Sequence, residues 1–226
     1  MHAYRLQSKL ILTITAALIL LPALALYLFE FSQPRWETLT FSERLLASLF
    51  QSVTPRTAGF NTVDLTRLAG SSQMLLILLM LVGGSPGSTA GGFKVTTLAV
   101  LLLSARAVFF RRGSPSCFGR RFQDEALRSA SAIFLMYLVF FLLGGTLICC
   151  IDGVPLLDAL FESASAIGTV GLSICGTPGL SLPSHLILTF LMYVGRVGIL
   201  SFSIAFLTRS KYPAKIKYPT FDIMIG

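Results

Sequence analysis

Two short segments of the sequence could bind a cation through their backbone carbonyl groups. They read TAGFN at residues 57–61 and GTVGLS at residues 168–173. Backbone that leaves the helical conformation frees its carbonyl oxygens, and in potassium channels carbonyls from TVGYG segments replace the water around the ion. TVGLS keeps the Thr-Val-Gly of that pattern, and TAGFN keeps its threonine and glycine. Both segments are therefore predicted to be cation filters.

The central glycines of these segments, Gly59 and Gly171, support this prediction. Glycine adopts backbone conformations closed to other residues, and it has no side chain to obstruct a pore. The alternative is an ordinary glycine-rich loop between helices, which two copies in matching surroundings make less favoured. We predict that the cation is held by backbone atoms only, along Thr57, Ala58, Gly59, Phe60 and Asn61 and along Gly168, Thr169, Val170, Gly171, Leu172 and Ser173.

A third glycine-rich segment, GGSPGSTAGGFK at residues 83–94, invites comparison with a phosphate-binding loop. That motif requires Gly-Lys followed by Ser or Thr, after a strand. Here Phe93 precedes Lys94, and an apolar span precedes the segment. We expect instead a helix broken at membrane depth, whose loop gates the pore from the cytoplasmic side; close helix packing through Gly87 and Gly91 is the alternative. The predicted gate residues are Gly83, Gly84, Ser85, Pro86, Gly87, Ser88, Thr89, Ala90, Gly91, Gly92 and Lys94.

Arg196 carries a charge near the middle of the apolar stretch 182–207. A charge inside a membrane span is a functional hypothesis by default. It could limit cation occupancy below the second filter, or it could hold the broken helix through its carbonyls. The alternative is a structural ion pair with a buried acid, for which the sequence offers few carboxylates at that depth. We predict a gating charge near the pore.

The composition indicates an integral membrane protein. The chain is 54% hydrophobic and 12% charged, about half the charge of a typical soluble domain. Its net charge of +8 does not predict nucleic-acid binding, because the basic residues lie beside apolar spans without an aromatic platform. With two histidines, and four cysteines without CxxC spacing, a catalytic or metal cluster is not expected. We therefore expect neither an enzyme nor a covalently bound cofactor.

Four apolar spans are predicted, at residues 10–29, 72–110, 130–151 and 182–207. Pro22 is a tolerated kink in the first span, and the glycine-rich segment breaks the second. An amphipathic or apolar stretch of roughly ten residues precedes each filter. As a helix it would rise about 15 Å, half of the hydrocarbon core. We predict re-entrant segments, in which a half-helix enters the membrane and extended chain leaves it.

The two halves of the sequence align as an internal repeat. LLASLFQS (45–52) matches LLDALFES (156–163), TAGFN matches TVGLS after one extra residue, and MLVGG (80–84) matches MYVGR (192–196). The predicted fold is an all-α integral membrane protein with two helix–pore-loop–helix repeats, like those of potassium channels, and one broken span. The predicted boundaries are 1–111, which includes the gate loop, and 112–226, which ends in a basic cytoplasmic tail.

The charge distribution predicts the orientation. Each repeat crosses the membrane twice, so both termini and the central loop share one side, and basic clusters mark that side as cytoplasmic. Residues 152–184 contain acids but no lysine or arginine, so we place them outside. The expected location is the cell inner membrane, with several passes through the lipid bilayer. The basic clusters are Arg5 and Lys9; Arg106, Arg111, Arg112, Arg120, Arg121 and Arg128; and Arg209, Lys211, Lys215 and Lys217.

The motifs TPRTAGFNTVD, GGSPGSTAGGFK, SAIGTVGLS and MYVGRVG resemble those of the bacterial Trk/Ktr family of potassium-uptake membrane subunits, related to plant and fungal potassium transporters. The resemblance covers nearly the whole chain and is closest to the KtrB- and NtpJ-like branch of this TrkH/KtrB family. In that family, four helix–loop–helix repeats surround one pore, and each provides a filter centred on glycine. A broken helix in the third repeat forms a gate loop, and an arginine of the last repeat lies near it. The resemblance implies these roles for Gly59, Gly171, residues 83–92 and Arg196.

The chain has two repeats, similar to the third and fourth of the family, and two loops cannot enclose an ion alone. The missing repeats could come from the same gene, from another chain, or from self-association of two copies. A fragment or split gene is the favoured interpretation, because the two loops differ and the gate loop occurs once. The resemblance also implies a homodimer of complete pores and a cytoplasmic nucleotide-binding ring as regulatory partner.

Two functions stay open at this point. The leading one is a potassium-translocating pore subunit, passive or ion-coupled, with sodium as a candidate coupling or regulatory ion. The alternative is a non-conducting, half-length membrane protein that assembles with or regulates a full-length subunit. A membrane enzyme ranks third, because no cluster of acids, histidines or a nucleophile lies at one depth.

Overall fold

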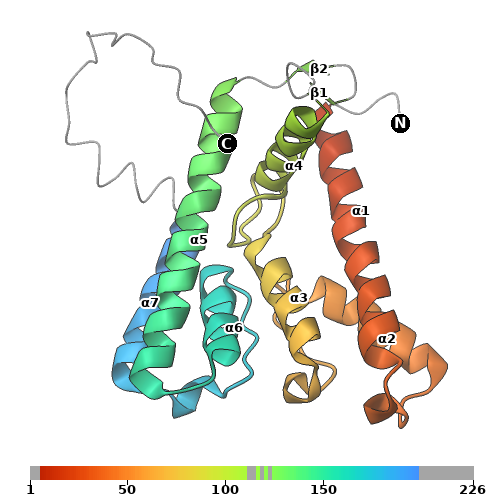
Figure 1. Cartoon of the computed structure of the whole chain (residues 1–226), viewed down its shortest axis with the longest axis vertical. Helices are drawn as coiled ribbons and strands as arrows, with labels where there is room; N and C mark the ends of the chain where they lie inside the picture. Colours follow the sequence, from red (N-terminus) through yellow and green to blue (C-terminus); the bar gives the residue numbers. More distant parts are fainter. Residues whose placement is uncertain (1–5, 111–115, 118–119, 122–123, 199–226) are drawn as a thin grey trace.

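The computed structural model describes residues 6–110, 116–117, 120–121 and 124–198 (Figure 1). Apart from one antiparallel pair of two-residue strands, β1 (Ser116–Cys117) and β2 (Arg120–Arg121), the regular elements of these residues are helical. This confirms the predicted all-α class. The helices are α1 (Leu6–Leu26), continued by a π-helical turn (Tyr27–Phe31), α2 (Phe41–Val53), α3 (Gly70–Leu81), α4 (Val95–Phe109), α5 (Asp124–Asp152), α6 (Leu156–Ile167) and α7 (Leu182–Val197), with 3₁₀ turns at Pro34–Trp36, Leu65–Arg67 and Thr177–Gly179.

The two longest helices are apolar over most of their length. The stretch Gln7–Phe31 has 25 residues and Glu125–Asp152 has 28, and both are long and apolar enough to cross a membrane. Both leave large apolar side chains exposed, for example Leu21 on α1 and Leu135 on α5. Helices α3, α4 and α7 are shorter but also apolar.

The short helices α2 and α6 lead into the two predicted filters. Helix α2 starts with a capping box, in which the Thr40 N–H and hydroxyl donate to Glu43 Oε2 at 2.7 and 2.9 Å. Helix α6 starts directly after Pro155, where the chain turns from α5. Proline suits such a start because the first N–H groups of a helix have no partner within the helix, so the N–H that proline lacks is not missed. Each short helix ends where a Thr- and Gly-containing segment begins.

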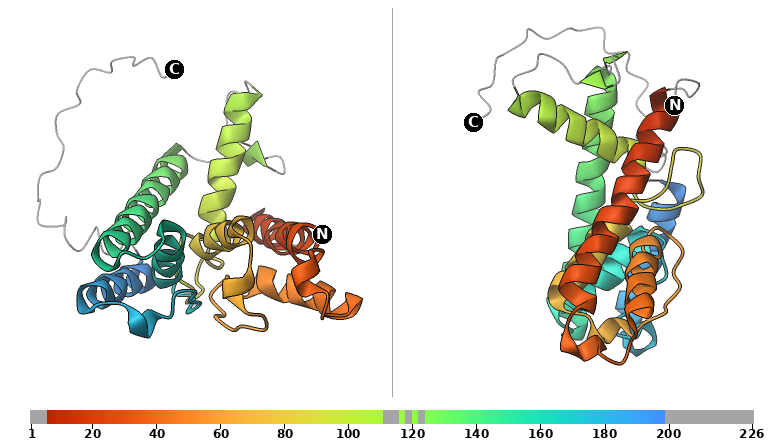
Figure 2. Two further views of the ribbon diagram at one scale, coloured as in Figure 1. Left: turned by 60° about the horizontal axis from the view of Figure 1, so that its bottom comes forward. Right: turned by 90° about the vertical axis from the view of Figure 1, so that its right-hand side faces the viewer.

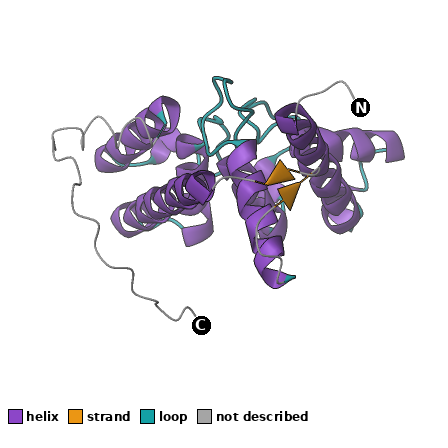
Figure 3. Ribbon diagram, turned by 90° about the horizontal axis from the view of Figure 1, so that it is seen from above, coloured by secondary structure: helices purple, strands orange, loops and turns teal. Residues whose placement is uncertain are grey.

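The helices form two groups with loops gathered between them (Figures 1 and 3). In one group α1 packs against α2, and in the other α5 packs with α6 and α7. Helices α3 and α4 connect the groups, because α3 packs on α6 and α4 on α5, while much of α4 projects from the body of the molecule (Figure 2). The start of α1, the end of α4 and the start of α5 lie at the same end (Figure 1). The predicted topology, with two membrane crossings per repeat, expects these three ends on one side.

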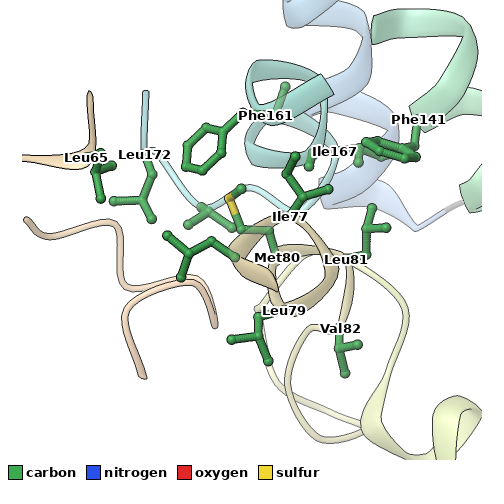
Figure 4. Close-up of a cluster of buried hydrophobic side chains, with 14 of the residues drawn as sticks. Leu65, Ile77, Leu79, Met80, Leu81, Val82, Phe141, Phe161, Ile167 and Leu172 are labelled. Atoms are coloured by element: carbon green, nitrogen blue, oxygen red, sulfur yellow. The ribbon is translucent and has the colours of Figure 1, made fainter. Parts of the chain in front are cut away.

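The core lies between the two groups. Ile77 and Met80 of α3 are fully buried against Phe161 and Ile167 of α6, which are also fully buried, and Phe141 of α5 closes the cluster (Figure 4). The second predicted span appears as α3 and α4, with residues 82–94 interrupting it.

Part of the predicted topology falls on residues whose placement the structure does not describe. The fourth span was expected to reach residue 207, and the structure describes α7 to Val197. The remainder of that span, the basic tail and several residues of the basic clusters lie outside the described residues; these basic residues are Arg5, Arg111, Arg112, Arg209, Lys211, Lys215 and Lys217.

Candidate ion-binding site

The two predicted filter segments adopt the same unusual backbone conformation. Thr57 and Thr169 have φ angles of 67° and 52°, and they are the non-glycine residues with positive φ in the described part of the chain. Gly59 and Gly171, two positions further on, also have positive φ, at 75° and 95°. A threonine in this left-handed region is strained, because its Cβ crowds the backbone. The same strain at both aligned positions indicates a shared, specific loop geometry.

A hydroxyl group from the end of each short helix fixes this geometry. Thr54 Oγ1 accepts from Phe60 N–H at 3.0 Å and donates to Phe60 O at 2.6 Å. In the second half, Ser165 Oγ accepts from Gly171 N–H at 3.2 Å. Thr54 and Ser165 occupy aligned positions of the repeat. Because the helices α2 and α6 end at these loops, the negative ends of their dipoles also point toward them.

The two loops lie against each other, although more than a hundred residues separate them along the chain. A Cβ atom added at Gly59 would lie 2.2 Å from Val170 O and 3.6 Å from Gly171 Cα. Only glycine permits this approach of one loop backbone to the other. The repeat predicted two similar loops, and the structure places them side by side.

A buried carboxylate supports the carboxyl-terminal end of the second loop. Glu162 of α6 accepts hydrogen bonds from the Ser173 hydroxyl (2.6 Å), the Ile174 N–H (3.0 Å) and the Thr177 hydroxyl (3.0 Å). The aligned residue of the first half is Gln51, which is fully buried and whose side-chain amide has no partner among the described residues. The two halves therefore have similar loops, but the side chain at the aligned position of the preceding helix forms hydrogen bonds only in the second half.

The predicted gate loop is anchored at its base by backbone pairing. The Gly83 N–H donates to Phe93 O at 2.9 Å, and the Phe93 N–H donates to Leu81 O at 3.1 Å. At its far side the loop contacts the second filter segment, where the Gly91 N–H donates to Thr169 Oγ1 at 3.0 Å. Residues 83–94 therefore lie directly against the second loop.

The packing alternative for this loop applies to one of its two glycines. A Cβ on Gly91 would lie 2.4 Å from Thr169 Oγ1 and 2.6 Å from Gly168 O, so Gly91 is required for close packing. A Cβ on Gly87 would have no atom within 4 Å. Gly87 instead has a φ of 85°, which suits a turn at the exposed tip of the loop.

Two basic side chains hold carbonyl groups of the same loop. Arg196 of α7 donates from Nη1 to Thr89 O, and Lys94 donates from Nζ to Ala90 O at 2.7 Å and to Ser88 O at 3.1 Å. Among the described residues Arg196 forms no salt bridge with an acid. Its contact corresponds to the second role considered for it, in which it holds the broken helix through its carbonyls.

Arg56, in the first loop, contacts the base of the gate loop. Its Nη2 donates to Gly83 O at 3.3 Å. Arg56 was not predicted from the sequence, because the second copy of the repeat has no arginine at the matching position. Glu162 and the Thr54/Ser165 pair were also missed. The aligned hydroxyls before each filter were a signal that could have identified that pair.

A cavity of about 480 Å³ borders the second loop. Its wall contains residues 169–173 of the loop, Glu162 behind it, and Leu188, Met192 and Arg196 of α7. The second predicted filter and Arg196 thus face one space. In the part of the chain that the structure describes, no group of three His, Cys, Asp or Glu side chains could hold a metal ion.

Comparison with known proteins identifies relatives of this chain by sequence and by fold. The sequence matches the TrkH family, described as cation transport proteins, over residues 5–215. It is 35% identical to the potassium/sodium uptake protein NtpJ of Enterococcus hirae over 98% of this chain and 50% of the relative, and 34% identical to the Ktr system potassium uptake protein B of Bacillus subtilis over 99% of this chain and 50% of the relative. The crystal structure of the potassium transporter TrkH from Vibrio parahaemolyticus has a similar fold, with a TM-score of 0.66 and 22% identity over 87% of this chain and 43% of that one. The chain spans about half the length of the curated relatives it matches.

Proposed function

The chain belongs to the TrkH family of cation transport proteins, and from this premise we propose that it forms part of a pore that takes up potassium across the cell membrane. The observation that carries the proposal is the pair of filter loops. Gly59 and Gly171 follow left-handed threonines in both loops, and the two backbones touch at Gly59 and Val170. A glycine-rich connection without a binding role has no need of the same strained geometry twice.

The selective step uses backbone atoms. Residues of positive φ that alternate with residues of negative φ change the direction in which successive peptide groups point, so carbonyls of residues 57–61 and 168–173 can face a common axis. Such carbonyls replace the water around a dehydrated cation. The negative ends of the α2 and α6 dipoles favour a positive charge at the same place. Two loops provide part of a coordination shell, and further loops from a preceding pair of repeats complete it.

The membrane arrangement follows from the helices. Helices α1 and α5 cross the bilayer, α2 and α6 are re-entrant half-helices, and α3 with α4 forms a broken span, so each of the two repeats (1–111 and 112–226) is a helix–pore-loop–helix unit. The length of α1 and α5 and their exposed leucines support this assignment. The end that holds the start of α1 and the end of α4 is cytoplasmic, as the basic residues beside it favour.

Residues 83–94 and Arg196 form the gate. The loop lies directly against the second filter, and Arg196 holds it through Thr89 O. In this position it obstructs the cytoplasmic exit of the filter, and conduction requires its displacement. A positive charge at Arg196, facing the same cavity, also opposes a cation that would rest below the filter.

The complete transporter includes partners beyond this chain. A preceding pair of repeats closes the pore, two complete pores form a homodimer, and a cytoplasmic nucleotide-binding ring regulates them. Sodium acts as a coupling or regulatory ion; the name of the E. hirae relative, a potassium/sodium uptake protein, supports its inclusion. These assignments rest on family membership and on the half-length match.

Rubidium uptake in a potassium-uptake-deficient bacterial strain tests the proposal. The chain is expressed alone and together with the first two repeats of a full-length relative. We expect uptake with the added half, and we expect Gly171→Asp to abolish it. Uptake by the chain alone, also abolished by Gly171→Asp, would mean that self-assembly completes the pore. No uptake in either case, with membrane insertion verified, would favour the non-conducting interaction protein.

A further inference from the structure

The gate loop and the second filter share a hydrogen bond whose acceptor is a side chain. The buried Gly91 N–H donates to Thr169 Oγ1 at 3.0 Å. Backbone contacts surround this bond, because a Cβ on Gly91 would meet Gly168 O at 2.6 Å and a Cβ on Gly168 would meet Met80 O at 2.4 Å. A buried N–H that loses its partner costs free energy unless water or another acceptor replaces it. Loop displacement therefore has to break this bond.

The position of the Thr169 hydroxyl depends on the filter backbone. Thr169 has a φ of 52°, and its β-branched side chain has few rotamers. A change of the backbone at this residue therefore carries the hydroxyl away from Gly91. The filter conformation and the gate-loop position are thus linked through one side chain, in addition to the Arg196 contact at the loop tip.

The internal repeat provides a natural contrast. Thr57 is the aligned threonine of the first loop and has nearly the same φ, 67°. Its hydroxyl makes no hydrogen bond to another described residue, and the first loop reaches the gate loop instead through Arg56 and Gly83 O. The hydroxyl link to the gate loop is therefore specific to the second filter.

We propose that the Thr169 hydroxyl is the latch that couples the second filter to the gate loop. It holds residues 83–94 in the obstructing position while the filter keeps its left-handed threonine. Potassium in the filter favours that backbone geometry, and an empty filter loosens the latch. By reciprocity, displacement of the gate loop weakens ion binding at the second loop. This inference rests on the proposed function, since it regulates the same site.

Thiol labelling of the gate loop tests the latch independently of transport. The half-buried Ala90 is replaced by cysteine in a background whose four native cysteines are alanine. The chain is examined in inverted membrane vesicles with a membrane-impermeant maleimide, alone and with the complementary half. We expect Thr169→Val to label on the order of five-fold faster than the parent, as the loss of one hydrogen bond predicts. Replacement of potassium by choline should accelerate labelling of the parent but not of Thr169→Val.

Two matched variants and one steric variant complete the design. Thr57→Val makes the same chemical change at the same backbone geometry, and Thr169→Ser retains the hydroxyl, so both should label at the parent rate. Gly91→Ala should label as fast as Thr169→Val, because its methyl group displaces the loop from Thr169. Equal rates for Thr169→Val and the parent, or an equal acceleration in Thr57→Val or Thr169→Ser, would overturn the proposal. Because the readout requires no conduction, failure of the uptake assay would leave it interpretable.

Discussion

The two helix–loop pairs have similar sequences, but their surroundings differ. On α6 and the second loop, Phe161 is 0% and Leu172 is 2% exposed, whereas the aligned Phe50 and Phe60 of the first are 36% and 70% exposed. The cause is the neighbour on the amino-terminal side. Helix α3 packs on α6, and among the described residues no equivalent helix precedes α2. The burial of α6 therefore depends on α3, and the corresponding face of α2 is open among the described residues.

The buried polar groups show the same difference. Glu162 satisfies three donors from the chain after the second loop, while the aligned Gln51 is buried without a partner among the described residues. Buried amides usually have partners in native structures. Gln51 therefore shows that the first loop has fewer hydrogen-bonding neighbours than the second among the described residues.

Substitution of the two filter glycines should give the largest effects and should not be equivalent. Gly59→Ala is unfavourable for two reasons, because the φ of this residue is 75° and a new Cβ would lie 2.2 Å from Val170 O. Gly171→Ala has only the unfavourable φ of 95°, with no atom within 4 Å of a new Cβ. We expect uptake to fall by more than about ten-fold in Gly59→Ala, and by less in Gly171→Ala, for which the left-handed conformation costs about 1–2 kcal/mol. Rubidium uptake by the assembled pore measures both, and the reverse order would contradict the contact between the loops.

Truncation of the aligned apolar residues that follow the filter glycines should give the next largest effect. The change in the free energy of unfolding should differ between the two units. Leu172→Ala should lower the free energy of unfolding by about 2–4 kcal/mol, because the side chain is buried. Phe60→Ala should change it by less than about 0.5 kcal/mol in this chain alone, because its side chain is exposed. Thermal unfolding of the purified chain in detergent provides the comparison. When a preceding pair of repeats is present, the cost of Phe60→Ala should rise; an unchanged cost would mean that nothing covers the first loop.

The buried polar pair should give an intermediate effect. Glu162→Gln replaces one acceptor oxygen by a donor, so we expect a loss of about 2 kcal/mol, as for hydrogen bonds to charged groups. Gln51→Met should be neutral, or stabilising by up to about 1 kcal/mol, because it removes a buried amide that lacks a partner. The unfolding midpoint of each variant is measured and compared with that of the parent. A loss for Gln51→Met as large as that for Glu162→Gln would mean that Gln51 already has a partner within the chain.

Removal of the loop-supporting hydroxyls should have the smallest effect per hydrogen bond lost, and that effect should be similar in the two units. Ser165→Ala removes the acceptor of the Gly171 N–H, and Thr54→Val removes the acceptor of the Phe60 N–H and the donor to Phe60 O, so each variant should cost about 1 kcal/mol for each hydrogen bond lost. The same unfolding assay measures them. A large effect in one unit alone would show that the two loops do not depend on the same support.

The sequence predicted what the repeat encodes locally. The broken second span, the ends of α2 and α6 and the positions of Gly59 and Gly171 all follow from glycine, threonine and apolar periodicity, which act over a few residues. The contacts of Arg56 with Gly83 and of Thr169 with Gly91 were not predicted, because they depend on how α3 and residues 83–94 pack against the loops. The unequal burial of Phe50 and Phe161 was also not predictable, because it depends on a neighbouring unit rather than on either sequence.

The central claim is that the second loop is a potassium filter, and one matched pair of variants tests it most directly. Gly171→Asp places a side chain in the filter segment, whereas Gly179→Asp places the same side chain a short distance further along, at an exposed glycine where a new Cβ would have no atom within 4 Å. Rubidium uptake is measured for both variants, with the complementary repeats present and the amounts in the membrane equalised. We predict that Gly171→Asp abolishes uptake and Gly179→Asp retains it. Uptake by Gly171→Asp at the level of Gly179→Asp would contradict the assignment of this loop as a filter.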